Sequence, residues 1–237
     1  MNNMKYTIII PALNPNDELI KLVNDLLTNG FNDIIVINDG SKKIYNNIFL
    51  SLPKCIKIIN HNMNKGKGAA LKSAIKVLNN TTDAFITVDA DGQHKINDIL
   101  KIKESLKNND IVLGVRNFKS KNVPLRNRFG NKISSLVFKL KTGITLNDTQ
   151  TGLRGINIKY KDFCLETKGN RYEYEMNFLY NIAKKNINIK KVNIETIYDN
   201  NKNSHFNIIR DSFLIHKWII FVLFLVILLI LCLIILF

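Results

Sequence analysis

The sequence holds two carboxylates one residue apart, Asp89 and Asp91, directly after the apolar run at 84–88. In α/β sheets, ligands bind at the carboxyl ends of the strands, so both side chains can turn toward one ligand. Oxygen ligands suit a hard cation, and Mg²⁺ typically keeps one or two carboxylates while substrate phosphates and water complete its shell. The pair therefore predicts a Mg²⁺ or Mn²⁺ site that carries a diphosphate. Taken alone, the pattern also fits two solvated aspartates in a turn.

Two other polar loops have residues that are suited to binding a ligand. Asp39 comes after the apolar run at 33–37, and a carboxylate at that strand end can accept hydrogen bonds from a ribose or a base. The loop at 64–70 opens a helical pattern, and its glycines let the backbone approach a ligand closely. Neither the Walker spacing nor the dinucleotide-binding glycine spacing is present, which removes the main support for an ATPase or a dehydrogenase.

Short apolar runs alternate with helical patterns around these loops, which is typical of an α/β fold with a mostly parallel sheet and helices on both faces. We expect strands at 7–11, 33–37, 56–59, 84–88 and 111–115, and helices at 17–29 and 68–78. A strand at 152–158, a helix at 173–185 and a strand at 189–194 complete the expected globular part, before a polar loop at 199–204.

Residues 126–141 form a basic amphipathic pattern. One stripe of this pattern consists of Phe129, Ile133, Leu136, Val137 and Leu140. The basic residues around it are Arg126, Arg128, Lys132, Lys139 and Lys141. Such a helix can pack its stripe on the sheet and expose a solvated basic face, or it can lie at a membrane surface. The sequence leaves both interpretations open.

The chain of 237 residues has room for one α/β domain, expected at 1–200, plus appendages. Residues 218–237 are uninterruptedly apolar, and at about 1.5 Å per residue they reach about 30 Å, the thickness of a bilayer core. The sequence thus predicts one C-terminal transmembrane helix after a juxtamembrane segment at 201–217. Positive charge at Arg210, His216 and Lys217 places the domain on the cytoplasmic side of a single-pass membrane protein.

The net charge of +15, from 34 Lys and Arg against 19 Asp and Glu, would attract nucleic acid or anionic lipid headgroups. However, Asp39, Asp89 and Asp91 put negative charge in the clefts that a nucleic acid would approach, and no aromatic-basic RNA motif is present. We therefore expect no nucleic-acid partner. A non-catalytic membrane adaptor or RNA-binding protein is the rival class. Three scattered cysteines form no disulfide framework and no CxxC metal pattern, which fits a reducing compartment.

The order of these motifs resembles the family 2 glycosyltransferases of GT-A fold, and among them the dolichol-phosphate mannosyltransferase and polyprenyl-phosphate glycosyltransferase group. The motifs that carry the resemblance are Pro11-Ala12-x-Asn14, Asn38-Asp39-Gly40-Ser41, Asn64-x-Gly66-Lys67-Gly68-Ala69, Asp89-Ala90-Asp91-Gly92-Gln93, Gly114-Val115-Arg116, the segment 147–155 and Ser204-His205-Phe206. Members usually begin with Pro-Ala-Tyr-Asn-Glu-Glu and carry Asp-Asp-Gly-Ser. Here Leu13 and Pro15 replace the aromatic and the first acid, and Asn38 replaces the first aspartate, so the identity of the donor stays open.

The resemblance implies roles for individual residues. Asp39 would contact the nucleoside of a nucleotide-sugar donor, while Asp91 and Gln93, with Asp89 beside them, would hold the metal and the donor. The other donor contacts that it implies are Pro11, Ala12, Asn14, Gly66, Lys67 and Lys202. The acceptor phosphate would meet Arg116, Arg128 and Lys132. Catalysis would rest on the two aspartates together with Arg116 and Arg128.

The implied reaction is the inverting transfer of a hexose from a nucleotide sugar, of the GDP-mannose or UDP-glucose type, to a polyprenyl or dolichyl phosphate. Such a phosphate needs no general base, because with a second pKa of about 6 it is largely ionised at neutral pH. The alternative is a saccharide acceptor in cell-surface glycan synthesis, whose hydroxyl would need a base such as Asp148 or Glu175. Glu175 could equally pair with Arg154. The expected partners are the donor, the lipid phosphate, the membrane and a membrane partner subunit that the span could recruit.

Overall fold

A computed structural model of the protein describes residues 4–118 and 123–197. The predicted juxtamembrane segment, the predicted transmembrane helix at 218–237 and Lys202 lie outside these residues. Within the described ranges, none of the helices combines the length and the apolar character needed to cross a bilayer.

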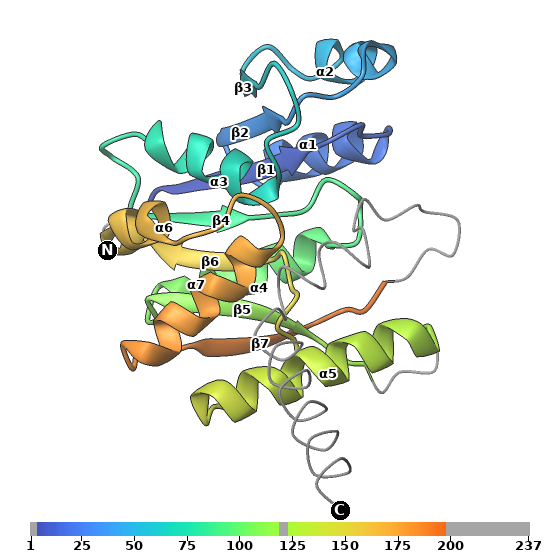
Figure 1. The fold of residues 1–237 in the computed structure, drawn as a ribbon. Helices are drawn as coiled ribbons and strands as arrows, with labels where there is room; N and C mark the ends of the chain where they lie inside the picture. The colour runs from blue at the N-terminus through green and yellow to red at the C-terminus, as the bar shows by residue number, and fades with distance from the viewer. Residues whose placement is uncertain (1–3, 119–122, 198–237) are drawn as a thin grey trace, which may run out of the picture. The chain divides into compact units, whose positions relative to one another are not determined.

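A mixed sheet of seven strands forms the centre of the described part, in the order β3-β2-β1-β4-β6-β5-β7 (Figure 1). The strands are β1 (Tyr6–Ala12), β2 (Asp33–Asn38), β3 (Lys57–Asn60), β4 (Ala84–Thr87), β5 (Ile111–Arg116), β6 (Arg154–Asn157) and β7 (Lys190–Ile194). Neighbouring strands run parallel, except that β6 is antiparallel to both β4 and β5. The predicted mostly parallel α/β sheet is therefore confirmed.

Helices cover both faces of this sheet (Figure 1). They are α1 (Glu18–Thr28), α2 (Asn46–Leu50), α3 (Lys67–Lys76), α4 (Ile96–Leu106), α5 (Leu125–Thr142), α6 (Lys161–Glu166) and α7 (Glu173–Lys184), with short 3-10 turns at Lys43–Tyr45 and Ile158–Tyr160. Successive strand residues point to opposite faces, so Ile86 of β4 packs with α1 and α4 while Phe85 lies against α3 and α7. Strands buried on both faces read as continuous apolar runs, which is why they were visible in the sequence.

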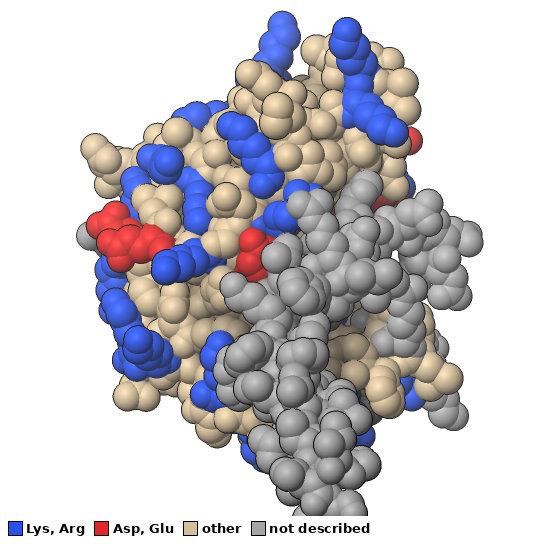
Figure 2. All heavy atoms as spheres, in the orientation of Figure 1, with Lys and Arg blue, Asp and Glu red and all other residues tan. Residues whose placement is uncertain are grey.

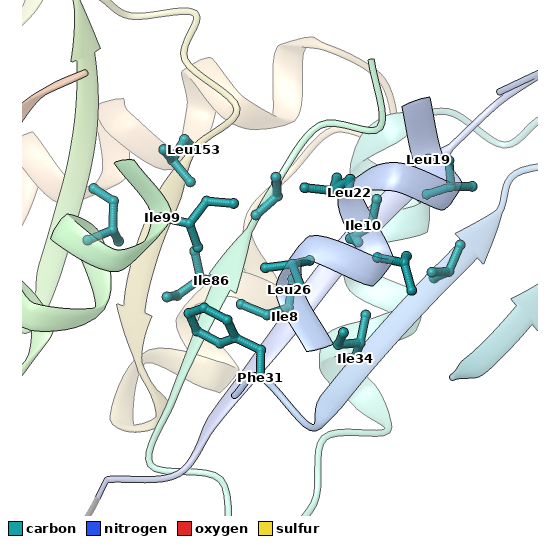
Figure 3. Packing of buried hydrophobic residues seen from close by; sticks show 14 of the residues in the cluster. Ile8, Ile10, Leu19, Leu22, Leu26, Phe31, Ile34, Ile86, Ile99 and Leu153 are labelled. Atoms are coloured by element: carbon teal, nitrogen blue, oxygen red, sulfur yellow. The ribbon is translucent and has the colours of Figure 1, made fainter. Parts of the chain in front are cut away.

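The core between α1, α4 and the sheet shows how the apolar pattern fixes the helices (Figure 3). Leu19, Leu22 and Leu26 recur every three or four residues, and they meet Ile8 and Ile34 on the strands. Full burial of each such side chain favours folding by about 1.5–3 kcal/mol. Because α1 and α4 are held in this way, the loops at the carboxyl ends of β1 and β4 have a rigid base.

Helix α5 packs on the domain by a different face from the expected stripe. Asn131, Ser134 and Phe138 are buried together with Val137, and the Phe138 ring stacks on Tyr180 of α7 at 5.4 Å between centroids. The other members of the stripe are exposed, namely Phe129, Ile133, Leu136 and Leu140. The interpretation in which the whole stripe packs on the sheet is therefore wrong. The stack with α7 and the contacts of Asn131 and Ser134 with the 147–150 loop hold this face of α5 inward.

Candidate active site

Asp89, the first of the two aspartates that follow β4, lies beside a largely buried lysine. Lys67, in the first turn of α3, places its Nζ 2.7 Å from Oδ1 of Asp89 and 3.0 Å from Oε1 of Glu175 on α7. Nε2 of His94 lies 3.7 Å from the other oxygen of Asp89. Lys67 thus joins the β4 loop, α3 and α7 around one positive charge.

The charges around Lys67 set the ionisation of the site. Burial lowers the pKa of Lys67, but Asp89 and Glu175 outweigh burial and raise that pKa above its ordinary value. Burial likewise raises the pKa of Asp89, and Lys67 and His94 outweigh it, so the pKa of Asp89 falls well below its usual range. Asp89 and Lys67 therefore stay charged together near neutral pH.

The pKa of Asp91 is shifted in the opposite direction from that of Asp89. Burial first and then the charge of Asp89 raise the pKa of Asp91 above its usual range, although the backbone N–H of Gln93 donates to Oδ1 of Asp91 at 3.0 Å. A divalent cation relieves this kind of repulsion between neighbouring carboxylates.

The residues around Asp91 fit a hard cation. The described residues contain no cluster of three or more His, Cys, Asp or Glu side chains suited to a metal. A cation at Asp91 would find the carboxylate of Asp91, with Asp89 two residues before it, and the amide oxygen of Gln93 as a further oxygen donor. Mg²⁺ is usually bound in that way, together with substrate phosphates.

Gly152, in the loop before β6, touches the Asp89 carboxylate. A Cβ at this position would lie closer to Oδ2 of Asp89 than real Cβ atoms approach. The Thr87 hydroxyl donates to the carbonyl of Gly152 at 2.7 Å and holds that loop against the end of β4. A glycine is therefore needed for the backbone to pass this close to the carboxylate.

Asp39 is buried and anchors the loop before α3. Its carboxylate accepts the backbone N–H of Lys65 at 3.0 Å and that of Gly66 at 2.8 Å. Nδ1 of His61 lies 2.6 Å from Oδ1 of Asp39, and Nε2 of His61 lies 2.9 Å from the Ser73 hydroxyl. Gly66 has φ of +99°, so the loop turns where glycine is favoured. In the structure, Asp39 shapes the loop that leads to Lys67, and its contact with a nucleoside stays a prediction.

The end of β1 is tied to the loop after β2. The backbone N–H of Asn14 donates to the Ser41 hydroxyl at 2.8 Å, and Oδ1 of Asn14 accepts the N–H of Lys42 at 2.9 Å. Pro11 and Ala12 are paired in register with the last residues of β2. Pro11, Ala12 and Asn14 thus lie next to the carboxyl end of β2, and their contact with a donor stays a prediction.

Arg116, at the end of β5, is held by a buried carboxylate. Its Nε and Nη2 donate to the two oxygens of Asp148 at 2.7 and 3.0 Å, a bidentate pair. Asp148 also accepts the backbone N–H groups of Arg116 and Gln150. Asp148 is fully buried, and its oxygens serve this network.

The remaining predicted acceptor residues lie on α5. Arg128 is half-buried and its Nε donates to the carbonyl of Val123 at 3.1 Å, while Lys132 is exposed one turn further along. Among the possible bases, Glu175 is buried against Lys67 and also lies 3.9 Å from Nη2 of Arg154. The ion-pair role of Glu175 is the one that the structure displays.

A sequence profile described as Glycosyl transferase family 2 matches residues 7–165. The chain belongs to this family. Its relatives include a UDP-N-acetylglucosamine–dolichyl-phosphate N-acetylglucosaminyltransferase from Methanococcus voltae, 34% identical over 81% of this chain and 85% of its own. A dolichyl-phosphate beta-glucosyltransferase from Trichomonas vaginalis is 31% identical over 52% of this chain and 40% of its own.

Solved structures place this family 2 glycosyltransferase in the GT-A-like fold. The crystal structure of glucosyl-3-phosphoglycerate synthase from Mycobacterium tuberculosis, in complex with Mn²⁺, UDP and glucosyl-3-phosphoglycerate, superposes with a TM-score of 0.65. The match covers 85% of this chain and 74% of that chain at 13% identity, so it bears on the fold alone. The α/β GT-A-like fold predicted from the sequence is confirmed.

The structure gives three residues near Asp89 and Asp39 contacts that the sequence does not indicate. Lys67 lies between Asp89 and Glu175, and its predicted contact with the donor stays a prediction. His61 supports Asp39, and Gly152 lies against Asp89. A signal for Gly152 was present in its motif, but nothing in the sequence pairs His61 with a carboxylate 22 residues away.

Proposed function

We propose that this family 2 glycosyltransferase moves a sugar from a nucleotide donor to a polyprenyl or dolichyl phosphate, with inversion at the anomeric carbon. The observation that carries the proposal is the pair Asp89 and Asp91 at the end of β4, in which Asp89 is held by the largely buried Lys67. The acceptor class is suggested by the two relatives named for dolichyl phosphate.

On the donor side, the chain supplies a rigid cradle for a diphosphate. A divalent cation held by Asp91 and Gln93, beside Asp89, would act as a Lewis acid that offsets the diphosphate charge. Lys67 keeps Asp89 ionised and fixes its position, and Gly152 closes the loop over that carboxylate. These contacts of Asp89 support it as a group that positions the donor, and they leave Asp91 as the proposed main metal ligand.

On the acceptor side, the buried carboxylates favour a phosphate over a sugar hydroxyl. A general base must reach the acceptor proton. Asp148 is fully buried with Arg116, and Glu175 is buried with Lys67, so both candidate bases are already engaged with cations. An ionised phosphate needs no base and has to be positioned against the repulsion of the donor diphosphate. Arg116, with Arg128 and Lys132 on α5, is the basic group proposed to receive it.

The donor and the cellular setting complete the proposal. UDP-N-acetylglucosamine is the first donor to test because the Methanococcus voltae relative is named for it, and UDP-glucose and GDP-mannose follow. Residues 218–237 are proposed to anchor the domain as a single span on the cytoplasmic side, where a membrane partner subunit could join it.

Transfer of radiolabelled sugar into an organic-extractable polyprenyl phosphate tests the proposal with the full chain in detergent and Mn²⁺. We expect label in the lipid phase from one of the three donors, and loss of that label in Asp91→Asn. The surface variant Asp110→Asn is the matched control and should retain transfer, because Asp110 pairs with Lys159 on the surface. Lack of lipid label from every donor, with metal-dependent nucleotide binding intact, would move the function to a saccharide acceptor.

A further inference from the structure

Helix α5 carries a row of large apolar side chains on its outer face. They are Leu125, Phe129, Ile133, Leu136 and Leu140, and four of the five have more than half of their surface exposed. At 3.6 residues per turn the five positions fall within about 80° of one another. Scattered exposed apolar residues are ordinary, but a continuous row marks an interaction surface. The other large exposed apolar residues of the described ranges lie away from α5, with Ile44 and Leu50 in the segment 43–50, Met63 before α3 and Val77 after α3.

The opposite face of α5 is fixed to the domain, so the row has a defined direction. Phe138 stacks on Tyr180 of α7, and the amide of Asn131 donates to the carbonyl of Asn147. Nε2 of Gln150 lies 3.3 Å from the Ser134 hydroxyl. These contacts bind α5 to the 147–150 loop, which carries the carboxylate that holds Arg116. The apolar row is therefore oriented relative to the candidate acceptor site.

The charge of α5 indicates what covers the row. The helix carries Arg126, Arg128, Lys132, Lys139 and Lys141. It contains no Asp or Glu. At about 100° per residue, Arg128, Lys132 and Lys139 lie along one border of the apolar row, and both lysines are exposed. Basic residues beside a large apolar face are the composition of helices that lie in the membrane interface.

Charge complementarity favours an anionic bilayer over a second copy of the chain or the segment 201–217 as the surface that covers the apolar row. A second copy of the chain would bring an equally basic helix against α5. The chain's own segment at 201–217 is also basic, with Lys202, Arg210 and Lys217 against Asp211. Anionic headgroups attract such a surface. Figure 2 shows Lys and Arg spread widely over the face in view, with Asp and Glu gathered in few places, so the rest of the domain adds to this attraction.

We propose that α5 lies flat on an anionic lipid bilayer, with the apolar row at the boundary between headgroups and acyl chains and with Arg128, Lys132 and Lys139 at the headgroups. This contact does not depend on the predicted span. It would also place the Arg116 region at the depth where a lipid phosphate is presented, and that consequence rests on the proposed function.

A single tryptophan on α5 tests the contact in the full chain. The sequence has one tryptophan, Trp218, which is replaced by Phe so that Phe129→Trp is the only reporter. In vesicles that contain anionic phospholipid, we expect its emission to shift to the blue and to be quenched by lipids brominated on the upper acyl chain. The matched control is Leu50→Trp, on the exposed side of α2, whose emission should stay unshifted and unquenched.

Three results would overturn the proposal. The first is a tryptophan at position 129 that stays unquenched although the protein floats with the vesicles in a density gradient. The second is a blue shift without quenching by lipid, which would mean that protein covers the row. The reporter protein that also carries Lys132→Glu and Lys139→Glu should lose most of the quenching, and so should the reporter protein with both lysines at high salt. Quenching that neither the two substitutions nor high salt reduces is the third result, because it would refute the role of anionic headgroups. Because the readout is lipid contact, its failure is distinct from a failure of sugar transfer.

Discussion

Replacement of Lys67 by methionine should destabilise the protein by exposing the repulsion that the lysine offsets. Methionine keeps the apolar length of the side chain, so the change removes mainly the charge. Removal of one partner from a buried ion pair costs about 3–5 kcal/mol of unfolding free energy. The Asp89 side chain keeps 28% of its surface exposed, and water screens part of its charge, so we expect about 2–3 kcal/mol.

The effect should depend on pH with a defined sign. The folded protein depresses the pKa of Asp89, so its charged form contributes stability above the pKa of an unfolded aspartate, about 3.9. That contribution is lost as the pH falls toward the folded-state pKa. The stability gap between the wild type and Lys67→Met is therefore full near neutral pH and closes on acidification below about pH 4.

Urea unfolding followed by far-ultraviolet circular dichroism measures this gap for the full chain in detergent. Lys159→Met is the control, because Lys159 pairs with Asp110 on the surface, and its unfolding curve should match the wild type. Equal stability of Lys67→Met and the wild type at neutral pH would refute the reasoning. A gap that persists unchanged in acid would refute the electrostatic cause.

Three further predictions concern the donor side of the site. Gly152→Ala should reduce kcat/KM for transfer by at least about tenfold, because its Cβ would displace Asp89, whereas Gly130→Ala, with open space around it, should leave transfer unchanged. His61→Ala should cost about 1–3 kcal/mol in urea unfolding and weaken nucleotide binding, because Asp39 loses its side-chain partner; nucleotide affinity equal to wild type would contradict that link. Removal of divalent cations by EDTA should abolish transfer, and Mn²⁺ or Mg²⁺ should restore it; activity in EDTA would exclude the metal site.

The strands and the site loops could be predicted because their signals are local. The runs that became β1, β2 and β4 are apolar on both faces, and the polar residues after them had to lie at one edge of the sheet. The reversed direction of β6 could not be predicted, because pairing with β4 and β5 is set by contacts far along the chain. Helix α4 was missed although Ile99, Ile102 and Leu106 carry its pattern.

Other features depend on which side chains meet in three dimensions. The apolar stripe on α5 could be seen, but not its direction, because burial of Asn131 and Ser134 follows from contacts with the 147–150 loop. Similarly, the family resemblance implies that Lys67 contacts the donor. Its position between Asp89 and Glu175 depends on α7, more than 100 residues away.

The asparagine that replaces the family's usual aspartate also has a physical role. Nδ2 of Asn38 donates to Oδ1 of Asn60 at 3.0 Å, and Oδ1 of Asn38 accepts the N–H of Ser41 at 2.9 Å. A carboxylate can accept but not donate, so an aspartate at this position would keep the contact only if the Asn60 amide turned to donate its NH2. The Asn38–Asn60 hydrogen bond ties the ends of β2 and β3 together beside Asp39 without adding a second negative charge there.

The acceptor is the central claim, and one comparison tests it directly. The full-length protein is given its active donor and Mn²⁺ with either a polyprenyl phosphate or the same polyprenol without the phosphate. We predict a glycolipid from the phosphate alone, with a rate that rises as the phosphate loses its second proton near pH 6. Equal or greater transfer to the free alcohol would contradict the account, because a hydroxyl acceptor requires a general base that Asp148 and Glu175, held by Arg116 and Lys67, do not provide.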